Sequence, residues 1–213
     1  TVLVFGLFFA GLMGVLLLTA TGRTTTIEEV VQRRTEEMAS LNEMADLLHA
    51  CEQPSEALTL IRSTAGKLFP GHACSLYLYN SSRNLLTCEI AWGDTTGREV
   101  EPIVPQDCWS LRRGQPHLLS GPDSGPRCRH LPDPPPASSW CFPLIAAGDT
   151  IGLLVMMSNR TPAPDAAATE VSVRLAKTIT QSVALALAGL QLREKFRQQS
   201  IRDPLTGLFN RRY

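Results

Sequence analysis

The apolar residues of the chain change their spacing several times, and each pattern predicts a different element. The first 20 residues, TVLVFGLFFAGLMGVLLLTA, contain no charged side chain. About 20 helical residues span the roughly 30 Å hydrocarbon core of a bilayer, so we expect residues 1–22 to form a transmembrane helix. The core of a signal peptide is the alternative, although such cores are usually shorter. Arg23, Arg33 and Arg34 follow the span closely, which favours a cytoplasmic location for the rest of the chain.

Residues 23–50 continue with apolar residues at a 4-3 spacing, which is typical of a coiled coil. The members of this seam are Ile27, Val31, Met38, Leu41, Ala45 and Leu48, with Arg34 at the one polar position. We expect a linker helix that merges into the next domain, and the alternative for Met44 to Leu48 is packing on that domain. A second helix follows, with Ser55 as its N-cap and Glu56 in its first turn.

Alternating strand patterns then occur between residues 73 and 158. Strands are predicted over residues 73–79, 85–92, 116–119, 139–147 and 150–158. Asp107 is expected to cap a short helix, DCWSLRRG, that stops at Gly114, and the proline-rich residues 121–136 are expected to form a loop. An antiparallel sheet with helices on one face, an α+β fold, fits this order.

A long helix is predicted over residues 166–202, with its cap at Asp165 and its end at Asp203-Pro204. Ala184 to Leu190 is apolar almost all round, so two faces of this helix need a partner. One face can cover the sheet. The same helix of a second chain is the simplest partner for the other face, and we therefore expect a homodimer through the helices.

The charge and composition of the chain argue against a nucleic-acid partner and against disorder. The 213 residues carry 20 Lys and Arg against 20 Asp and Glu, so the formal net charge is zero. A nucleic-acid partner is not expected, because such binders are basic. A hydrophobic content of 44% excludes a mostly disordered chain.

Three cysteines and one histidine form a candidate metal or redox site: Cys108, Cys128, His130 and Cys141. Three thiols and one imidazole suit a tetrahedral zinc or iron ion. Their spacing is irregular and includes no C-x-x-C pair, so buried cysteines and an exposed loop histidine are the alternative. Cys74 and Cys88 lie in predicted strands and are expected to pack in the core.

Three tryptophans are candidates for a ligand pocket, namely Trp92, Trp109 and Trp140. Aromatic residues in strands and helices more often belong to the core, which is the alternative here.

Two segments resemble the GAF domain family, DCWSLRRGQPHLL at 107–119 and SSWCFPLIAAGDTIGLLVMMS at 138–158. A C-x-P-L strand, a turn with glycine and a G-L-L strand are usual for that family. The resemblance covers residues 40–165. It implies a GAF-like antiparallel sheet in a module that senses a small-molecule or redox signal and dimerises, and the fold names no ligand.

The last eleven residues, DPLTGLFNRRY, resemble the start of a GGDEF domain, the catalytic domain of diguanylate cyclases. The pattern D-x-L-T-x-L-x-N-R-R is met at Asp203, Leu205, Thr206, Leu208, Asn210, Arg211 and Arg212. The resemblance implies an intact protein that condenses two GTP into cyclic di-GMP with Mg²⁺ or Mn²⁺, anchored in a bacterial inner membrane. Residues 203–213 cover only the start of that domain, so we expect a fragment without catalytic residues.

Two other outputs remain open. The same order of membrane helix, GAF domain and helix precedes histidine kinases. Such a kinase would place a phosphoacceptor histidine after the long helix, and no histidine follows His130. A degenerate GGDEF domain would leave a GAF module that binds a ligand without cyclase activity.

Overall fold

A computed structural model describes residues 32, 35–36, 38–93, 100–121, 123–159 and 166–201. The chain divides into two units, Thr1–Glu43 and Met44–Tyr213, and the second contains the whole sheet. The predicted transmembrane helix at 1–22, the start of the 4-3 seam and the motif at 203–213 lie outside the described residues. Within the described part, no helix has the length and hydropathy needed to cross a membrane.

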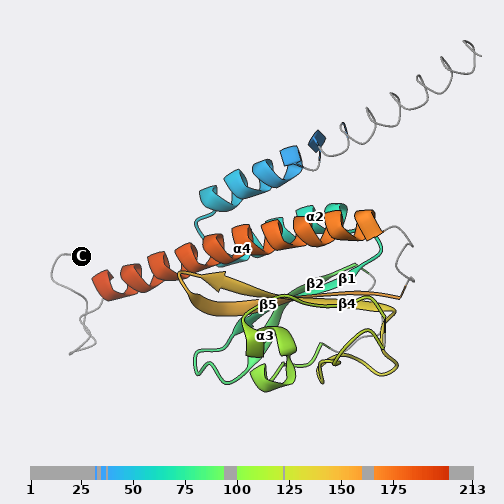
Figure 1. Ribbon diagram of the computed structural model, residues 1–213. Coiled ribbons are helices and arrows are strands. Elements are labelled where there is room, and N and C mark those ends of the chain that lie inside the picture. The colour runs from blue at the N-terminus through green and yellow to red at the C-terminus, as the bar shows by residue number, and fades with distance from the viewer. Residues whose placement is uncertain are drawn as a thin grey trace, which may run out of the picture. The chain divides into compact units, whose positions relative to one another are not determined.

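Five antiparallel strands form one sheet in the order β2-β1-β5-β4-β3 (Figure 1). The strands are β1 (Ala73–Tyr79), β2 (Leu86–Trp92), β3 (His117–Leu119), β4 (Ser138–Ala146) and β5 (Asp149–Ser158). Each predicted strand agrees with the structure to within one residue at each end, and the expected α+β fold is confirmed. Ala147 and Gly148 turn the chain between β4 and β5, both with positive φ.

Two long helices, α2 (Pro54–Leu68) and α4 (Ala166–Ile201), cover one face of the sheet (Figure 1). α2 buries Ala57, Ile61 and Ala65 at a spacing of four residues, which makes one apolar stripe. Residues 38–50 are also helical, and Met44 and Leu48 of the second unit are buried. This burial fits the alternative in which the later half of the linker packs on the domain.

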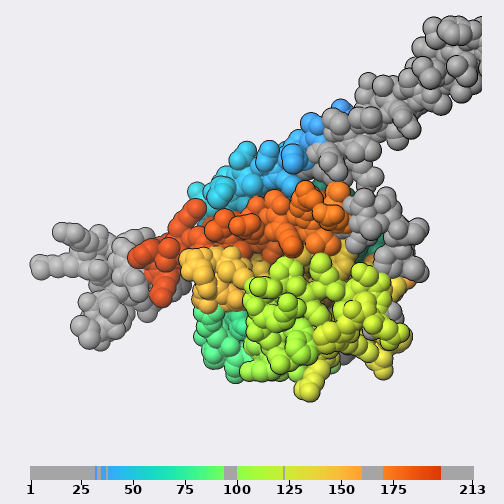
Figure 2. All heavy atoms as spheres, viewed as in Figure 1, coloured from blue at the N-terminus to red at the C-terminus, as the bar shows by residue number. Residues whose placement is uncertain are grey.

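The opposite face of the sheet carries a 3₁₀ turn, η1 (Pro105–Asp107), the short helix α3 (Trp109–Arg113) and the proline-rich loop. In the space-filling view these residues, coloured green to yellow, form one layer on the side of the sheet away from α4 (Figure 2). A continuous apolar cluster lies beneath that layer and includes Tyr77, Leu131, Leu153 and Val155. Helices therefore cover one face, and mostly loop covers the other.

Two predicted helix starts are wrong. The N-cap of α2 is Gln53 rather than Ser55, because Pro54 occupies the first helical position, which suits a residue with fixed φ and no N–H. Glu56 reinforces that start, since its Oε2 accepts the backbone N–H groups of Glu52 at 3.0 Å and Gln53 at 3.4 Å.

The second error concerns α3. Cys108, not Asp107, caps this helix, because Pro105 first folds residues 105–107 into the separate 3₁₀ turn. The predicted stop at Gly114 is confirmed, with φ 62° and ψ 26° in the left-handed region that glycine favours. Cys108 is thereby held at the start of the short helix, facing the apolar cluster.

Candidate functional site

The structure brings together the four residues of the candidate metal site, although they come from three separate segments. Cys108 precedes α3, Cys128 and His130 lie in the proline-rich loop, and Cys141 lies in β4. One ligand atom from each residue, a thiol Sγ or a ring nitrogen, lies within 4.8 Å of the other three. The Nε2 atom of His130 is 3.7 Å from the Sγ atom of Cys141.

Backbone contacts explain why the loop lies against the sheet at this point. The N–H of Arg129 donates to the carbonyl oxygen of Asp107 at 3.0 Å, which fixes the loop beside the start of α3. The N–H of Leu131 donates to the carbonyl oxygen of Cys128 at 3.3 Å, and the Leu131 side chain is buried. Cys141 is held from both sides, because β4 pairs with β3 and with β5.

The three thiols are almost completely removed from solvent, with exposed fractions of 0% for Cys108 and 1% for Cys128 and Cys141. The backbone N–H of Trp109 donates to Cys128 Sγ at 3.3 Å. Hydrogen bonds from Cys108 and Cys141 hold the pKa of Cys128 well below its ordinary value. The same hydrogen bond to Cys128, with burial, raises the pKa of Cys108 to about 12. Mutual hydrogen bonds of this kind favour a thiolate within the cluster, and the thiolate is the form that binds metals and reacts with electrophiles.

A cavity of about 270 Å³ adjoins the cluster on this face of the sheet. Its walls come from β1, β5, the chain around Ile103 and the loop from Arg129 to Pro132. Ser75, Tyr77, Glu101 and Arg129 supply polar groups. His130 belongs both to this wall and to the cysteine cluster. A small ligand in the cavity would therefore lie beside the cluster.

Sequence reasoning missed the residues of this cavity other than His130. The alternation of ACSLYLY indicates that Ser75 and Tyr77 share one face of β1, but not which face the loop covers. The polar residues of the other wall, Glu101 and Arg129, lie in irregular segments without periodicity.

The three candidate tryptophans are not brought together. Trp92 lies against Gly66 of α2, on the helix-covered face. Trp140 also packs on that side, with its ring centroid 5.4 Å from that of His72 and 6.4 Å from that of Phe142. Trp109 packs on the opposite face, with the Arg112 guanidinium 4.2 Å from its ring centroid. No tryptophan is among the described residues that line the cavity beside the cluster, or among those that line a second cavity between α4 and β4.

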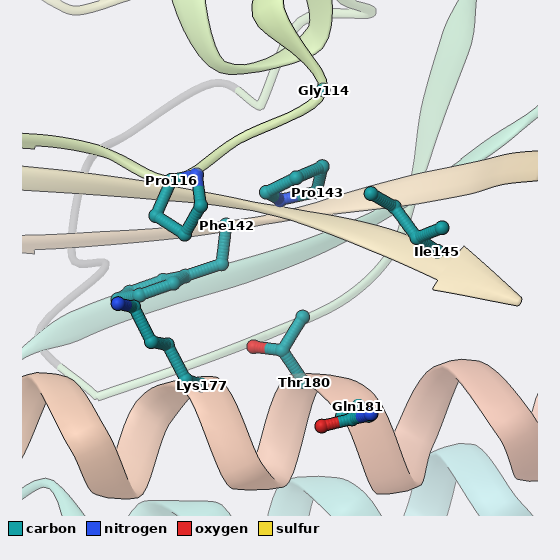
Figure 3. Close-up of a pocket in the computed structure, with 8 residues that line it drawn as sticks. All are labelled: Gly114, Pro116, Phe142, Pro143, Ile145, Lys177, Thr180 and Gln181. Carbon is teal, nitrogen blue, oxygen red and sulfur yellow. The ribbon is translucent and has the colours of Figure 1, made fainter. Parts of the chain in front are cut away.

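A second cavity of about 280 Å³ lies between α4 and β4. Lys177 and Thr180 point from α4 toward Phe142 of β4 (Figure 3). Pro116, Pro143 and Ile145 make the opposite wall largely apolar. The cavity marks the contact through which the sheet meets the long helix.

The other cysteines lie outside the cluster. Cys74 is buried in β1, and burial raises its pKa to about 12. Cys88 is half-buried in β2, and the Cys51 thiol donates to the carbonyl oxygen of Leu47. All six cysteines of the chain lie among the described residues and are free.

Comparisons with solved structures show the same fold in proteins of low identity. The GAF domain of the Acinetobacter phosphoenolpyruvate-protein phosphotransferase is 12% identical, with a TM-score of 0.60 over 74% of this chain and 95% of that chain. The corresponding GAF domain from Coxiella burnetii is 17% identical, with a TM-score of 0.59 over 75% and 96%. A free methionine-R-sulfoxide reductase from Neisseria meningitidis, solved in complex with its substrate, is 14% identical, with a TM-score of 0.59 over 74% and 91%.

No curated protein matches the sequence. The family model of the GAF domain matches residues 51–188, which is more than half of the chain. The match extends into α4, beyond the end expected at residue 165. The chain therefore belongs to the GAF domain family and contains a ligand-binding signalling module.

Proposed function

We propose that this GAF domain is the sensory and dimerisation portion of a membrane-bound diguanylate cyclase. The observation that carries the proposal is the motif DPLTGLFNRR, which meets every specified position of the GGDEF start. The described part of α4 ends at Ile201, two residues before Asp203. The long helix would therefore lead straight from the sensor into the catalytic domain.

The exposed side of α4 supports the dimerisation part of the proposal. Leu185, Leu192 and Phe196 are exposed by 54%, 53% and 61%, although each is a large apolar side chain. With Gly189 they follow a 4-3-4 spacing, which is typical of a two-helix seam. The other side of the helix buries Ile179, and its sheet contact is already made. A second copy of α4 is the occupant that this spacing favours.

A dimer also suits the chemistry of the proposed reaction. Each GGDEF domain would hold one GTP, so two domains have to meet before cyclic di-GMP can form. GTP and Mg²⁺ would be bound by residues that follow position 213, and the sensor would contribute no catalytic group. Its ligand would shift the equilibrium of the paired helices only as far as it binds their two arrangements with different affinity.

The direct test uses the intact protein, extended through the domain that follows residue 213. The coding sequence downstream is expected to contain GG[DE]EF, and the purified protein is expected to make cyclic di-GMP from GTP and Mg²⁺. A variant with the second acidic residue of that motif replaced by alanine is the control and should make none. A histidine kinase downstream, or an intact protein that makes no cyclic di-GMP, would refute the proposal. The second outcome would favour a GAF module attached to a degenerate GGDEF domain.

A further inference from the structure

We propose that Cys108, Cys128, His130 and Cys141 together bind one Zn²⁺ ion, which fastens the proline-rich loop to the sheet. The four ligand atoms already lie within 4.8 Å of one another. A tetrahedral zinc ion, with Zn–S of about 2.3 Å and Zn–N of about 2.0–2.1 Å, holds its ligand atoms about 3.5–3.8 Å apart. The His130–Cys141 pair, at 3.7 Å, already meets that spacing. The inference goes beyond the proposed function, since it does not depend on the domain that follows α4.

The donor set favours zinc in a closed site. Three cysteines and one histidine form a common tetrahedral set for structural zinc, and four protein ligands leave no open position for a substrate. A disulfide is the alternative use of neighbouring thiols. It would join two of the three sulfurs and leave the third thiol and His130 without a role.

The surroundings also suit thiolate ligands. The three sulfurs are buried, so an ion bound there would be shielded from water on the protein side. The N–H of Trp109 donates to Cys128 Sγ, which is the kind of outer contact that orients a metal ligand. Arg129 lies between two ligands in sequence, and its guanidinium pairs with Asp107 at 3.7 Å beside the third.

The topology explains what the ion would do for the fold. Residues 120–137 connect β3 to β4 without a helix or strand in their described part, and loops of this length usually serve a function or need an anchor. Two of the ligands belong to regular structure, since Cys108 lies at the start of α3 and Cys141 lies in β4. The other two, Cys128 and His130, lie in the loop. Zinc would join these parts, and it would fix the cavity wall formed by Arg129, His130 and Leu131.

The test measures bound metal in the full chain, purified without chelator and dialysed against zinc-free buffer. The expected result is one zinc ion per chain by elemental analysis. Cys128→Ser and Cys141→Ser are expected to lose at least about tenfold in zinc affinity, as removal of a ligand predicts. The matched control is Cys88→Ser, which removes a half-buried thiol outside the cluster and should keep the ion. Iron in place of zinc, no metal, or equal zinc in the wild type and Cys128→Ser would overturn the proposal.

A second measurement keeps the proposal testable if the cysteine variants fail to fold. Cobalt(II) added to the reduced wild-type chain should give the intense visible bands of a tetrahedral ion with thiolate ligands. His130→Cys keeps four ligands and should retain these bands with a shift. A wild-type chain that gives only the weak absorption of hydrated cobalt would also overturn the proposal.

Discussion

The Nε2 atom of His130 in the proline-rich loop lies 3.7 Å from the Sγ atom of Cys141 in β4. These residues are eleven positions apart in sequence, and the chain between them forms no helix and reaches β4 only at Ser138. Their contact joins the most irregular part of the described chain to a strand that has a hydrogen-bonded neighbour on each side. The order of the loop should therefore depend on what binds the cluster.

Removal of the proposed zinc should loosen the loop before the sheet unfolds. Arg127 and Arg129 are trypsin sites within the loop. Arg127 now donates hydrogen bonds to the carbonyl oxygens of Leu131 and Pro132. A zinc chelator is expected to speed cleavage at these arginines by about tenfold or more, because loss of the ion lowers the free energy of local opening of the loop by at least about 1.4 kcal/mol. Timed digestion with mass spectrometry measures this, and cleavage at Arg193 in α4 is the internal control. Equal rates with and without chelator would contradict it.

Gly152→Ala should destabilise the fold by about 1–3 kcal/mol, which is the usual cost of overpacking a closely packed core. A Cβ at this position would lie 2.2 Å from the carbonyl oxygen of Tyr77, so β5 and β1 would have to move apart. Urea unfolding measures the loss. Gly121→Ala is the control, since an added Cβ there meets nothing within 4 Å among the described residues, and its stability should stay within about 0.5 kcal/mol of the wild type.

Leu192→Lys should weaken self-association, because it places a charge in the exposed apolar stripe of α4. We expect the dimer dissociation constant to rise by about tenfold or more, measured by sedimentation of the full chain in detergent. Gln191→Lys adds the same charge to the neighbouring exposed position and should change it little. A similar effect of both substitutions would indicate general charge repulsion rather than a seam through Leu192.

The stability of the fold should fall in mild acid partly because of His72. Burial lowers the pKa of this imidazole in the folded chain, an effect only partly offset by the carbonyl of Pro70. The unfolded chain, with an ordinary histidine pKa of about 6.5, therefore binds more protons in this range. His72 does not affect stability at a pH well above the ordinary histidine pKa of the unfolded chain. Stability is lost as the pH falls below that value toward the lower pKa that His72 has in the folded chain.

His72→Phe tests this linkage, since it keeps a ring beside Trp140 and removes the titrating group. The free energy of unfolding of both proteins would be measured with chelator present, at about pH 7.5 and about pH 5.5. The wild type should lose more stability between these two values than the variant does. The same loss in both proteins would assign the acid sensitivity to other groups.

The sequence predicted the strands far better than the site they support. The alternation in ACSLYLY predicts a strand, and the turn residues around Gly148 predict where two strands end. Both signals involve residues close together in sequence, so they can be read without knowing the fold. Two helix starts were predicted wrongly, because Pro54 begins α2 ahead of Ser55, and Pro105 begins a separate 3₁₀ turn that contains Asp107. Which face of the sheet each tryptophan occupies depends on how the layers pack, and no local pattern contains that information.

The cysteine cluster is an intermediate case. Its residue types indicated a metal or redox site, while the irregular spacing gave no reason to place Cys108 beside Cys141. Their proximity depends on the pairing of His117 with Cys141 in β3 and β4, which places α3, with Cys108 at its start, against β4. The sequence pattern predicts each strand separately, but it does not show which residue of β3 lies opposite which residue of β4.

Cys141 and Phe142 are consecutive residues of β4, and consecutive side chains of a strand point to opposite faces. Cys141 belongs to the cysteine cluster, whereas Phe142 lines the cavity against α4. A structural change at the cluster that tilts β4 would move Phe142 and so alter the contact of β4 with α4. The two contacts are separated only by the backbone of one strand. Coupling between the two faces of the sheet through β4 would then need no relay of intermediate side chains. Substitutions elsewhere in the domain should affect its stability more than this coupling.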